Sequence, residues 1–304
     1  MIGSRTALLA LSRNPRMRHL TESSRLGRRV SSRFVAGLTL TDAIEAVAAV
    51  NRLGMSASLD PLGENVSSEA AAAEAAQTAC GILDAIDRHQ VDSNLSLKLT
   101  QLGLDLGLDL ARSQLQRIIA RAAEHKIFLR VDMEGSAYTA TTLDLVEQMH
   151  AEGANIGTVV QSYLRRTADD VERMLARGIR LRLVKGAYRE PAAIAFQDKA
   201  EVDANYVTLM QRLLDSGTYH AIATHDERII EATTRYAQQQ AIPASGFEFQ
   251  MLYGIRRDLQ QKLQAEGWRV RVYIPFGPEW YPYFMRRLAE RPANLLFLLK
   301  NLVK

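Results

Sequence analysis

Residues 270–290 read VRVYIPFGPEWYPYFMRRLAE and contain a strand, a turn and a helix in succession. The β-branched residues Val270 and Val272 precede Tyr273 and predict a buried strand. Gly277 and the prolines after it predict a tight turn. A proline in the first helical turn costs little, because the N–H that it lacks would have no partner there. Whether this strand–turn–helix unit repeats along the chain decides the fold.

The unit does repeat, because strands rich in Val, Ile and Leu alternate with helices about eight times along the 304 residues. We expect a first helix from Thr41-Asp42 to Gly54, and then strands at 56–60, 94–99, 127–134, 155–161, 179–187, 220–225, 247–254 and 269–275. The helices between them are expected at 68–88, 115–125, 143–152, 168–177, 203–215, 228–239 and 259–266. This order is typical of a parallel sheet covered by helices.

Eight units in about 250 residues predict an α/β fold of the (β/α)8 TIM-barrel type. A doubly wound sheet is the alternative, but no Gly-x-Gly-x-x-Gly motif follows the first strand. With 47% apolar and 24% charged residues the composition is that of a globular protein. The single cysteine, Cys80, excludes an internal disulfide and a cysteine-rich zinc site. No apolar run approaches the length that spans a membrane.

The net charge of +4 is distributed unevenly. Residues 1–35 contain eight arginines and one acid, Glu22, so they carry +7 and the rest of the chain carries −3. The folded body is therefore not a nucleic-acid binder by charge. We expect residues 1–40 to form extra N-terminal helices, an arm on a barrel domain of residues 41–304. Contact with anionic lipid and a cleaved targeting segment are the alternatives.

Polar residues follow the predicted strands, at the carboxyl ends where barrels of this type carry out chemistry. Arg182 is the clearest of them, because a charged residue in a strand of Leu and Val is rarely buried without a partner. Alone, Lys98 could be solvated, Asp132 could cap the next helix and His225 could belong to the core. Their joint occurrence favours a site made of Glu64, Lys98, Asp132, Gln161, Arg182, Lys185, Thr224, His225, Leu252 and Tyr273.

The helix after the last strand places four side chains on one face, at spacings of three and four residues: Tyr283, Arg286, Arg287 and Glu290. They form either a solvated face of ion pairs or a clamp for a carboxylate, which two guanidinium groups suit well. The polar strand ends favour the clamp and an anionic substrate. These residue types also allow a Schiff-base aldolase with Lys98 as nucleophile. A non-catalytic protein that binds surfaces through its arm is a third possibility.

From about residue 41 to the C-terminus the chain resembles the proline dehydrogenase family, specifically its single-function bacterial form. The most specific motifs are residues 273–290 and Arg182-Leu-Val-Lys185-Gly-Ala-Tyr188. The other matching motifs are Leu59-Asp-Pro-Leu-Gly-Glu64, Leu97-Lys98-Leu99, Val131-Asp132-Met-Glu134, Val160-Gln161-Ser-Tyr163, Ala223-Thr224-His225-Asp226 and Glu248-Phe-Gln-Met251-Leu-Tyr-Gly254.

The resemblance implies a flavoprotein on a distorted (β/α)8 barrel, without a metal. In it, FAD takes a hydride from L-proline to give Δ1-pyrroline-5-carboxylate, the first step of proline catabolism to glutamate. The electrons then pass to a quinone in the membrane. The implied location is cytoplasmic and peripheral on the inner face of the cytoplasmic membrane, and a separate pyrroline-5-carboxylate dehydrogenase is an expected partner.

The resemblance also implies a role for each matched residue. Asp132, Arg182 and Lys98 are expected to be catalytic, with Asp132 paired to Lys98. Glu64 is expected to form a gate with Arg286, and Glu290 to hold Arg287. The implied substrate-binding residues are Lys98, Ala187, Leu252, Tyr273, Tyr283, Arg286, Arg287 and Glu290. The implied FAD-binding residues are Met133, Gln161, Arg182, Lys185, Gly186, Ala187, Thr224 and His225.

Overall fold

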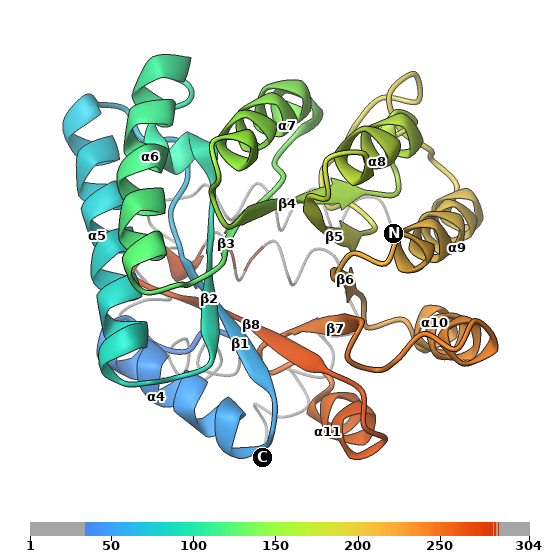
Figure 1. Ribbon diagram of the computed structural model, residues 1–304. Coiled ribbons are helices and arrows are strands. Elements are labelled where there is room, and N and C mark those ends of the chain that lie inside the picture. Colours follow the sequence, from blue (N-terminus) through green and yellow to red (C-terminus); the bar gives the residue numbers. More distant parts are fainter. Residues whose placement is uncertain (1–33, 282, 284, 286–304) are drawn as a thin grey trace.

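The strands of the computed structural model, which describes residues 34–281, 283 and 285, form a closed parallel barrel in sequence order. They are β1 (Ser56–Pro61), β2 (Ser93–Leu97), β3 (Leu129–Val131), β4 (Ile156–Gln161), β5 (Arg180–Val184), β6 (His220–Ala223), β7 (Phe247–Leu252) and β8 (Val270–Phe276). The helices are α4 (Leu40–Arg52), α5 (Glu69–Arg88), η1 (Leu99–Leu102), α6 (Leu108–Glu124), α7 (Ser136–Ala151), α8 (Thr167–Leu175), α9 (Lys199–Asp215), α10 (Glu227–Gln239) and α11 (Arg257–Ala265). Figure 1 shows the helices in a ring around the strands. The predicted (β/α)8 barrel is confirmed.

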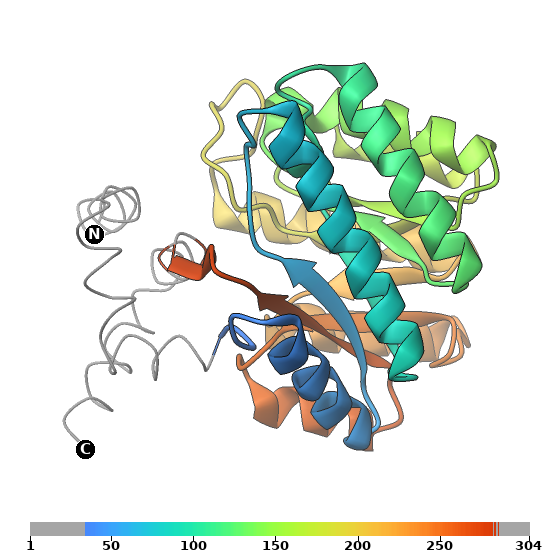
Figure 2. The same cartoon turned by 90° about the vertical axis from the view of Figure 1, so that its left-hand side faces the viewer.

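The barrel closes where β1 and β8 lie side by side, as Figure 2 shows. Their register runs from Ser56 opposite Arg271 to Pro61 opposite Phe276. The chain before α4 lies at the carboxyl end of this seam, because the N–H of Ala36 donates to the carbonyl of Pro275 at 2.9 Å. The predicted helices of residues 1–33 lie outside the described residues.

Several predicted boundaries were wrong. The first helix begins at Leu40, because Thr39 rather than Thr41 is its N-cap and Asp42 completes the capping box with Thr39. Helices α6 and α7 each begin seven residues before the predicted start. The first turns of α7 contain Ser136, Tyr138 and three threonines, which do not show a clear apolar period. Strand β3 covers only three residues.

The interior of the barrel is polar, whereas the outer faces of the strands are apolar and pack under the helices. Alternate residues of a strand face opposite sides of a sheet, so polar residues two apart share the inner side. The buried polar residues with this spacing are Ser58 and Asp60; Asn94, Ser96 and Lys98; Arg130 and Asp132; and Glu248 and Gln250. A barrel of this type normally fills its interior with Val, Ile and Leu, so each of these polar groups needs a partner.

Gly157 in β4 leaves the room that this interior needs. A Cβ at this position would lie 2.2 Å from the carbonyl oxygen of Arg180 and 2.8 Å from the ring of Phe128. By contrast, a Cβ at Gly81 in α5 would meet nothing within 4 Å.

We therefore expect Gly157→Ala to lower the free energy of unfolding by about 1–3 kcal/mol or more through overpacking. The matched change Gly81→Ala should raise it by about 0.5–1 kcal/mol, because glycine weakens the interior of a helix. Urea unfolding of both variants measures the two values. Equal effects of the two changes would contradict the tight contact at Gly157.

His220 at the start of β6 is fully buried and uncharged. The N–H of Leu181 donates to its Nδ1 at 3.0 Å, and its Nε2 lies 3.0 Å from Ser216 Oγ. Burial, followed by the positive charges of Arg130 and Arg180, lowers the pKa of His220 to about 3. The folded state therefore binds a proton at this ring far more weakly than the unfolded state does.

Between pH 6.5 and about 3 the unfolded chain binds a proton at His220 that the folded chain does not. The stability that the neutral ring contributes is thus fully present above pH 6.5 and falls with pH, by about 1.4 kcal/mol per pH unit. Urea unfolding at pH 7.5, 6.0 and 5.0 should show a shallower loss in His220→Asn, whose Oδ1 can accept the same N–H. Identical pH slopes in both proteins would exclude this account.

Candidate active site

A cavity of about 400 Å³ opens at the carboxyl ends of the strands. Every site residue predicted from the sequence that the structure describes lines this one cavity: Glu64, Lys98, Asp132, Met133, Gln161, Arg182, Lys185, Gly186, Ala187, Thr224, His225, Leu252, Tyr273 and Tyr283. The predicted residues Arg286, Arg287 and Glu290 lie outside the described part. The strand ends therefore bring most of the predicted set together.

Arg182 is the residue around which the cavity floor is built. It lies on β5 and is 5% exposed. Its guanidinium donates through Nη1 to Asp132 at 2.6 Å, through Nη2 to Ser96 at 3.0 Å, and through Nε to Gln250. It also lies 5.1 Å from the centre of the Tyr273 ring. One side chain thus connects β5 to β2, β3, β7 and β8 and keeps a fixed cation below the cavity.

The expected pair between Asp132 and Lys98 is not formed. Asp132 instead accepts from Arg182 and, at 2.6 Å, from the hydroxyl of Tyr273. Lys98 donates to Asp60 at 2.9 Å. Asp60 is 1% exposed and sits on β1, the strand beside β2. Asp132 does not cap a helix either, because the N-cap of α7 is Gly135.

Lys98 is held as an ammonium ion. Burial acts to lower its pKa, but the negative charges of Asp60, Asp132 and Glu64 outweigh burial, so its pKa is raised. A lysine that forms a Schiff base needs a lowered pKa, because only the free amine attacks a carbonyl. The structure therefore disfavours the aldolase alternative.

The loop after β5 forms one wall of the cavity and depends on Gly186. This residue has a φ of 113°, and a Cβ on it would lie 2.2 Å from the ring of Tyr163. The preceding residue, Lys185, is oriented by Asp226 at 2.7 Å and by Asp203 at 2.6 Å. Only glycine can adopt this positive φ and also approach the Tyr163 ring so closely. The resulting loop conformation leaves Lys185 at the edge of the cavity.

His225 connects the ends of β6 and β7. Its Nε2 accepts the N–H of Leu252 at 3.0 Å, so this nitrogen carries no proton. The neighbouring Thr224 accepts the N–H of Asp226 through its hydroxyl at 3.0 Å. Gln161 donates to the carbonyl of Glu134 at 3.1 Å. These bonds fix the strand ends, so the side chains that face the cavity are preorganised.

The cavity is also lined by residues that the sequence reasoning missed. Asp60 could have been found by an argument like the one that identified Arg182, because it is the one charged residue of its strand, Ser56–Pro61. Gln250 had no such signal, since glutamine is common on exposed surfaces. The other missed lining residues are Val159, Val184, Tyr188, Ala223, Asp226, Met251 and Ile255.

The lining suits a ligand with an apolar body and polar edges. Met133, Val159 and Leu252 supply apolar surface, while Gln161 and Arg182 supply hydrogen-bond donors. Within residues 34–281 with 283 and 285, no group of three or more His, Cys, Asp or Glu side chains could hold a metal ion. Across the same residues, no helix has the length and apolar character needed to cross a membrane.

The chain is similar to known proteins over nearly its whole length. The chain is 45% identical over 302 residues to "Proline dehydrogenase 1" of Bacillus subtilis (strain 168), covering 99% of each chain. It is 41% identical over 307 residues to "Proline dehydrogenase" of Deinococcus radiodurans, covering 99% of this chain and 98% of the relative.

A solved structure shares the fold. The proline utilization A (PutA) protein of Bdellovibrio bacteriovorus, inactivated by N-propargylglycine, superposes with a TM-score of 0.80 at 25% identity. The match covers 86% of this chain but only 32% of that longer one.

The family model described as "Proline dehydrogenase" matches residues 43–300. This range includes all eight strands and the helix predicted to follow β8. The chain is therefore an oxidoreductase that belongs to the proline dehydrogenase family.

Proposed function

We propose that the protein oxidises L-proline to Δ1-pyrroline-5-carboxylate by hydride transfer to FAD. The observation that carries the proposal is the cavity floor, where Arg182 is bonded to Asp132, Ser96 and Gln250 beside the Lys98–Asp60 pair. Near full-length relatives named proline dehydrogenase support the substrate.

The residues around the cavity fit a flavin. Its ring system is flat and largely apolar, with acceptor atoms along one edge, and the cavity offers Met133, Val159 and Leu252 for the ring and Arg182, Gln161 and Lys185 for the edge. The close approach of Gly186 to the ring of Tyr163 positions the loop that forms this wall of the cavity. We assign FAD binding to Met133, Gln161, Arg182, Lys185, Gly186, Ala187, Thr224 and His225. FAD, when bound there, supplies the two-electron redox chemistry that amino-acid side chains lack.

The chain's own residues bind and orient the substrate. Lys98 is a permanent cation and would attract the carboxylate of proline, together with the predicted clamp of Arg286 and Arg287. Tyr273, Tyr283, Leu252 and Ala187 would surround the ring. The predicted gate of Glu64 with Arg286 would cover the substrate, and Glu290 would hold Arg287.

The cations of the cavity act on the protonation state of the substrate. Hydride leaves the carbon next to the ring nitrogen only when the amine is neutral. Lys98 and Arg182, together with the predicted clamp of Arg286 and Arg287, oppose a further positive charge in the cavity, whereas Asp60, Glu64 and Asp132 act in the opposite direction. Arg182 would also stabilise negative charge that develops near the cavity floor during the reaction.

We further propose that electrons leave to a quinone in the membrane and that the product passes to a separate pyrroline-5-carboxylate dehydrogenase. The barrel domain of residues 41–304 would then work at the inner face of the cytoplasmic membrane, with the arginine-rich arm of residues 1–40 at the lipid surface. This places the reaction first in the breakdown of proline to glutamate.

The absorption spectrum tests the function directly. We expect the purified protein to be yellow, or to become yellow with added FAD, and to bleach when L-proline is added without oxygen. Glycine, which has a carboxylate but no ring, is the control and should leave the spectrum unchanged. A protein that stays colourless after incubation with FAD would refute the proposal.

Replacement of Lys98 tests its role in binding the carboxylate. Lys98→Met should raise KM for L-proline by roughly 10- to 150-fold, which corresponds to a charge-assisted hydrogen bond of about 1.5–3 kcal/mol. It also leaves Asp60 without its partner. Burial already raises the pKa of Asp60, and Asp132 raises it further against the attraction of Lys98, so Asp60 would take up a proton in the variant.

The matched control is the double variant Lys98→Met with Asp60→Asn, which removes both members of the buried pair. It should recover the thermal stability lost in Lys98→Met while keeping the high KM. A wild-type KM in either variant, measured by dye-linked turnover, would exclude Lys98 from substrate binding.

A further inference from the structure

A second cavity of about 400 Å³ lies at the opposite end of the barrel, at the amino ends of the strands. No residue of the proposed reaction lines it. Its walls come from the turns before β2 and β3 and from the first residues of several strands. They are Ile86, Asp87, Gln90, Val91, Asp92, Ser93, Asn94, His125, Lys126, Ile127, Phe128, Arg130, Arg180, Glu248 and Arg271.

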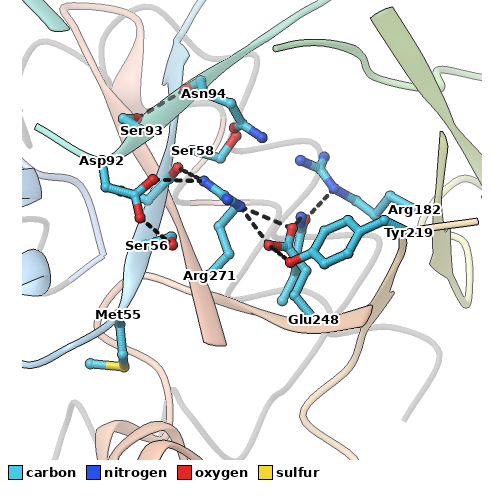
Figure 3. A network of polar contacts seen from close by, with 12 residues as sticks. Met55, Ser56, Ser58, Asp92, Ser93, Asn94, Arg182, Tyr219, Glu248 and Arg271 are labelled. Carbon is cyan, nitrogen blue, oxygen red and sulfur yellow. Dashed lines mark hydrogen bonds and ion pairs between the residues drawn. The ribbon is translucent and has the colours of Figure 1, made fainter. Parts of the chain in front are cut away.

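The carboxylates around this cavity all have partners. Glu248 is 3% exposed and accepts from Arg271 at 2.9 Å and from the hydroxyl of Tyr219 at 2.8 Å, as Figure 3 shows. Asp92 accepts from Ser56 at 2.6 Å and lies 3.8 Å from Arg271. Asp87 lies 3.3 Å from His125 Nδ1.

The arginines Arg130 and Arg180 have no such partners. Arg130 is 2% exposed, and its Nη1 donates to the carbonyls of Thr158 and Arg180, both at 2.8 Å. Its Nε has no partner. The side chain of Arg180 makes no hydrogen bond or ion pair with any described residue, and its buried Nε is also unpartnered. Both guanidinium groups lie against the ring of Phe128, at 4.7 Å for Arg130 and 4.3 Å for Arg180.

Neither guanidinium group forms an ion pair with a described acid, although the charge of Glu248 attracts both. Burial, followed by repulsion from Arg182, lowers the pKa of Arg130 well below its usual range against this attraction. Burial also lowers the pKa of Arg180, again against the attraction of Glu248. His220 responds to the same two arginines, as described above. Burying an unpaired cation costs free energy, which a bound anion would offset.

Other groups at the cavity are suited to an anion. Lys126 lies in the turn before β3, is exposed, and makes no side-chain hydrogen bond or ion pair in the described part of the chain. Asn94 is 6% exposed and its Oδ1 has no partner. Its NH2 group donates to no described residue, so it can donate to an anion in the cavity as it stands.

We infer that this cavity binds a phosphate group, free or carried by a small ester, between Arg180 and Lys126, with Asn94 as a further donor. Arg180 is half-buried and Lys126 exposed, so both can be reached from the cavity, whereas Arg130 acts through its charge. Phosphate fits better than a carboxylate, because these donors come from separate segments and a tetrahedral anion accepts from several directions. The inference does not depend on the reaction at the other end of the barrel.

Thermal unfolding of the full-length protein tests the inference, with sodium phosphate compared with sodium chloride at equal ionic strength. Phosphate should raise Tm in a saturable manner, because it binds only the folded state. Arg180→Gln should weaken the apparent affinity by roughly tenfold or more, since it removes a charge-assisted contact. Lys126→Gln, in an exposed turn that tolerates the change, should weaken it by a smaller factor.

The matched control is Arg212→Gln, which removes an exposed arginine that pairs with Glu172, and neither of these residues lines the cavity. It should keep the full phosphate effect. An unchanged effect in both Arg180→Gln and Lys126→Gln would overturn the site. An equal effect of acetate would overturn the assignment to phosphate.

A third measurement distinguishes free phosphate from a phosphate ester as the ligand. Tighter binding of ribose 5-phosphate than of inorganic phosphate would support an ester, and equal binding would support the free anion. If Arg180→Gln no longer binds ribose 5-phosphate or inorganic phosphate, the binding site of that anion lies in this cavity. These measurements need no FAD and no turnover, so they stand apart from tests of the proposed reaction.

Discussion

The structure depends on one buried guanidinium group inside the barrel. Arg182 can be accommodated there only because Asp132, Ser96 and Gln250 accept its hydrogen bonds from three other strands. A buried arginine without such partners would destabilise the fold, so the residues that stabilise the barrel interior also shape the cavity floor. Stability and site geometry therefore rest on the same contacts, and the cation lies in place before any ligand binds.

Gln250 extends this arrangement along the barrel axis. Its Oε1 accepts from Arg182 and its Nε2 donates to Glu248. Glu248 in turn accepts from Arg271, as Figure 3 shows. An amide suits this position because it can accept from a cation through its oxygen and donate to a carboxylate through its NH2 group. A leucine of similar size would remove one hydrogen-bond partner from each of the two charged groups. The two cavities are thus joined by a continuous chain of polar contacts through the barrel interior.

The repeat of strands and helices was predictable because short segments rich in Val, Ile and Leu alternate with segments of helical period along the chain. Helix starts were less so, since the first turns of α7 are rich in threonine. Arg182 was identified because it is a charge within an apolar strand, but its partners were not. Partners depend on how neighbouring strands are staggered around the barrel, and the pairing of Lys98 with Asp60 rather than Asp132 follows from that stagger. Arg180, two residues before Arg182, had the same signal and was not singled out.

The seam between β1 and β8 has a consequence for synthesis of the chain. Ser56 pairs with Arg271, so the first strand has no partner on one side until almost the whole barrel has left the ribosome. At about 5–20 residues per second, the ribosome takes roughly 10–40 s to make the residues between them. During this time the edge of β1 can pair with other chains, which makes the growing chain prone to aggregation. Closure of the barrel is thus a late event that joins contacts very distant in sequence, and this topology folds slowly.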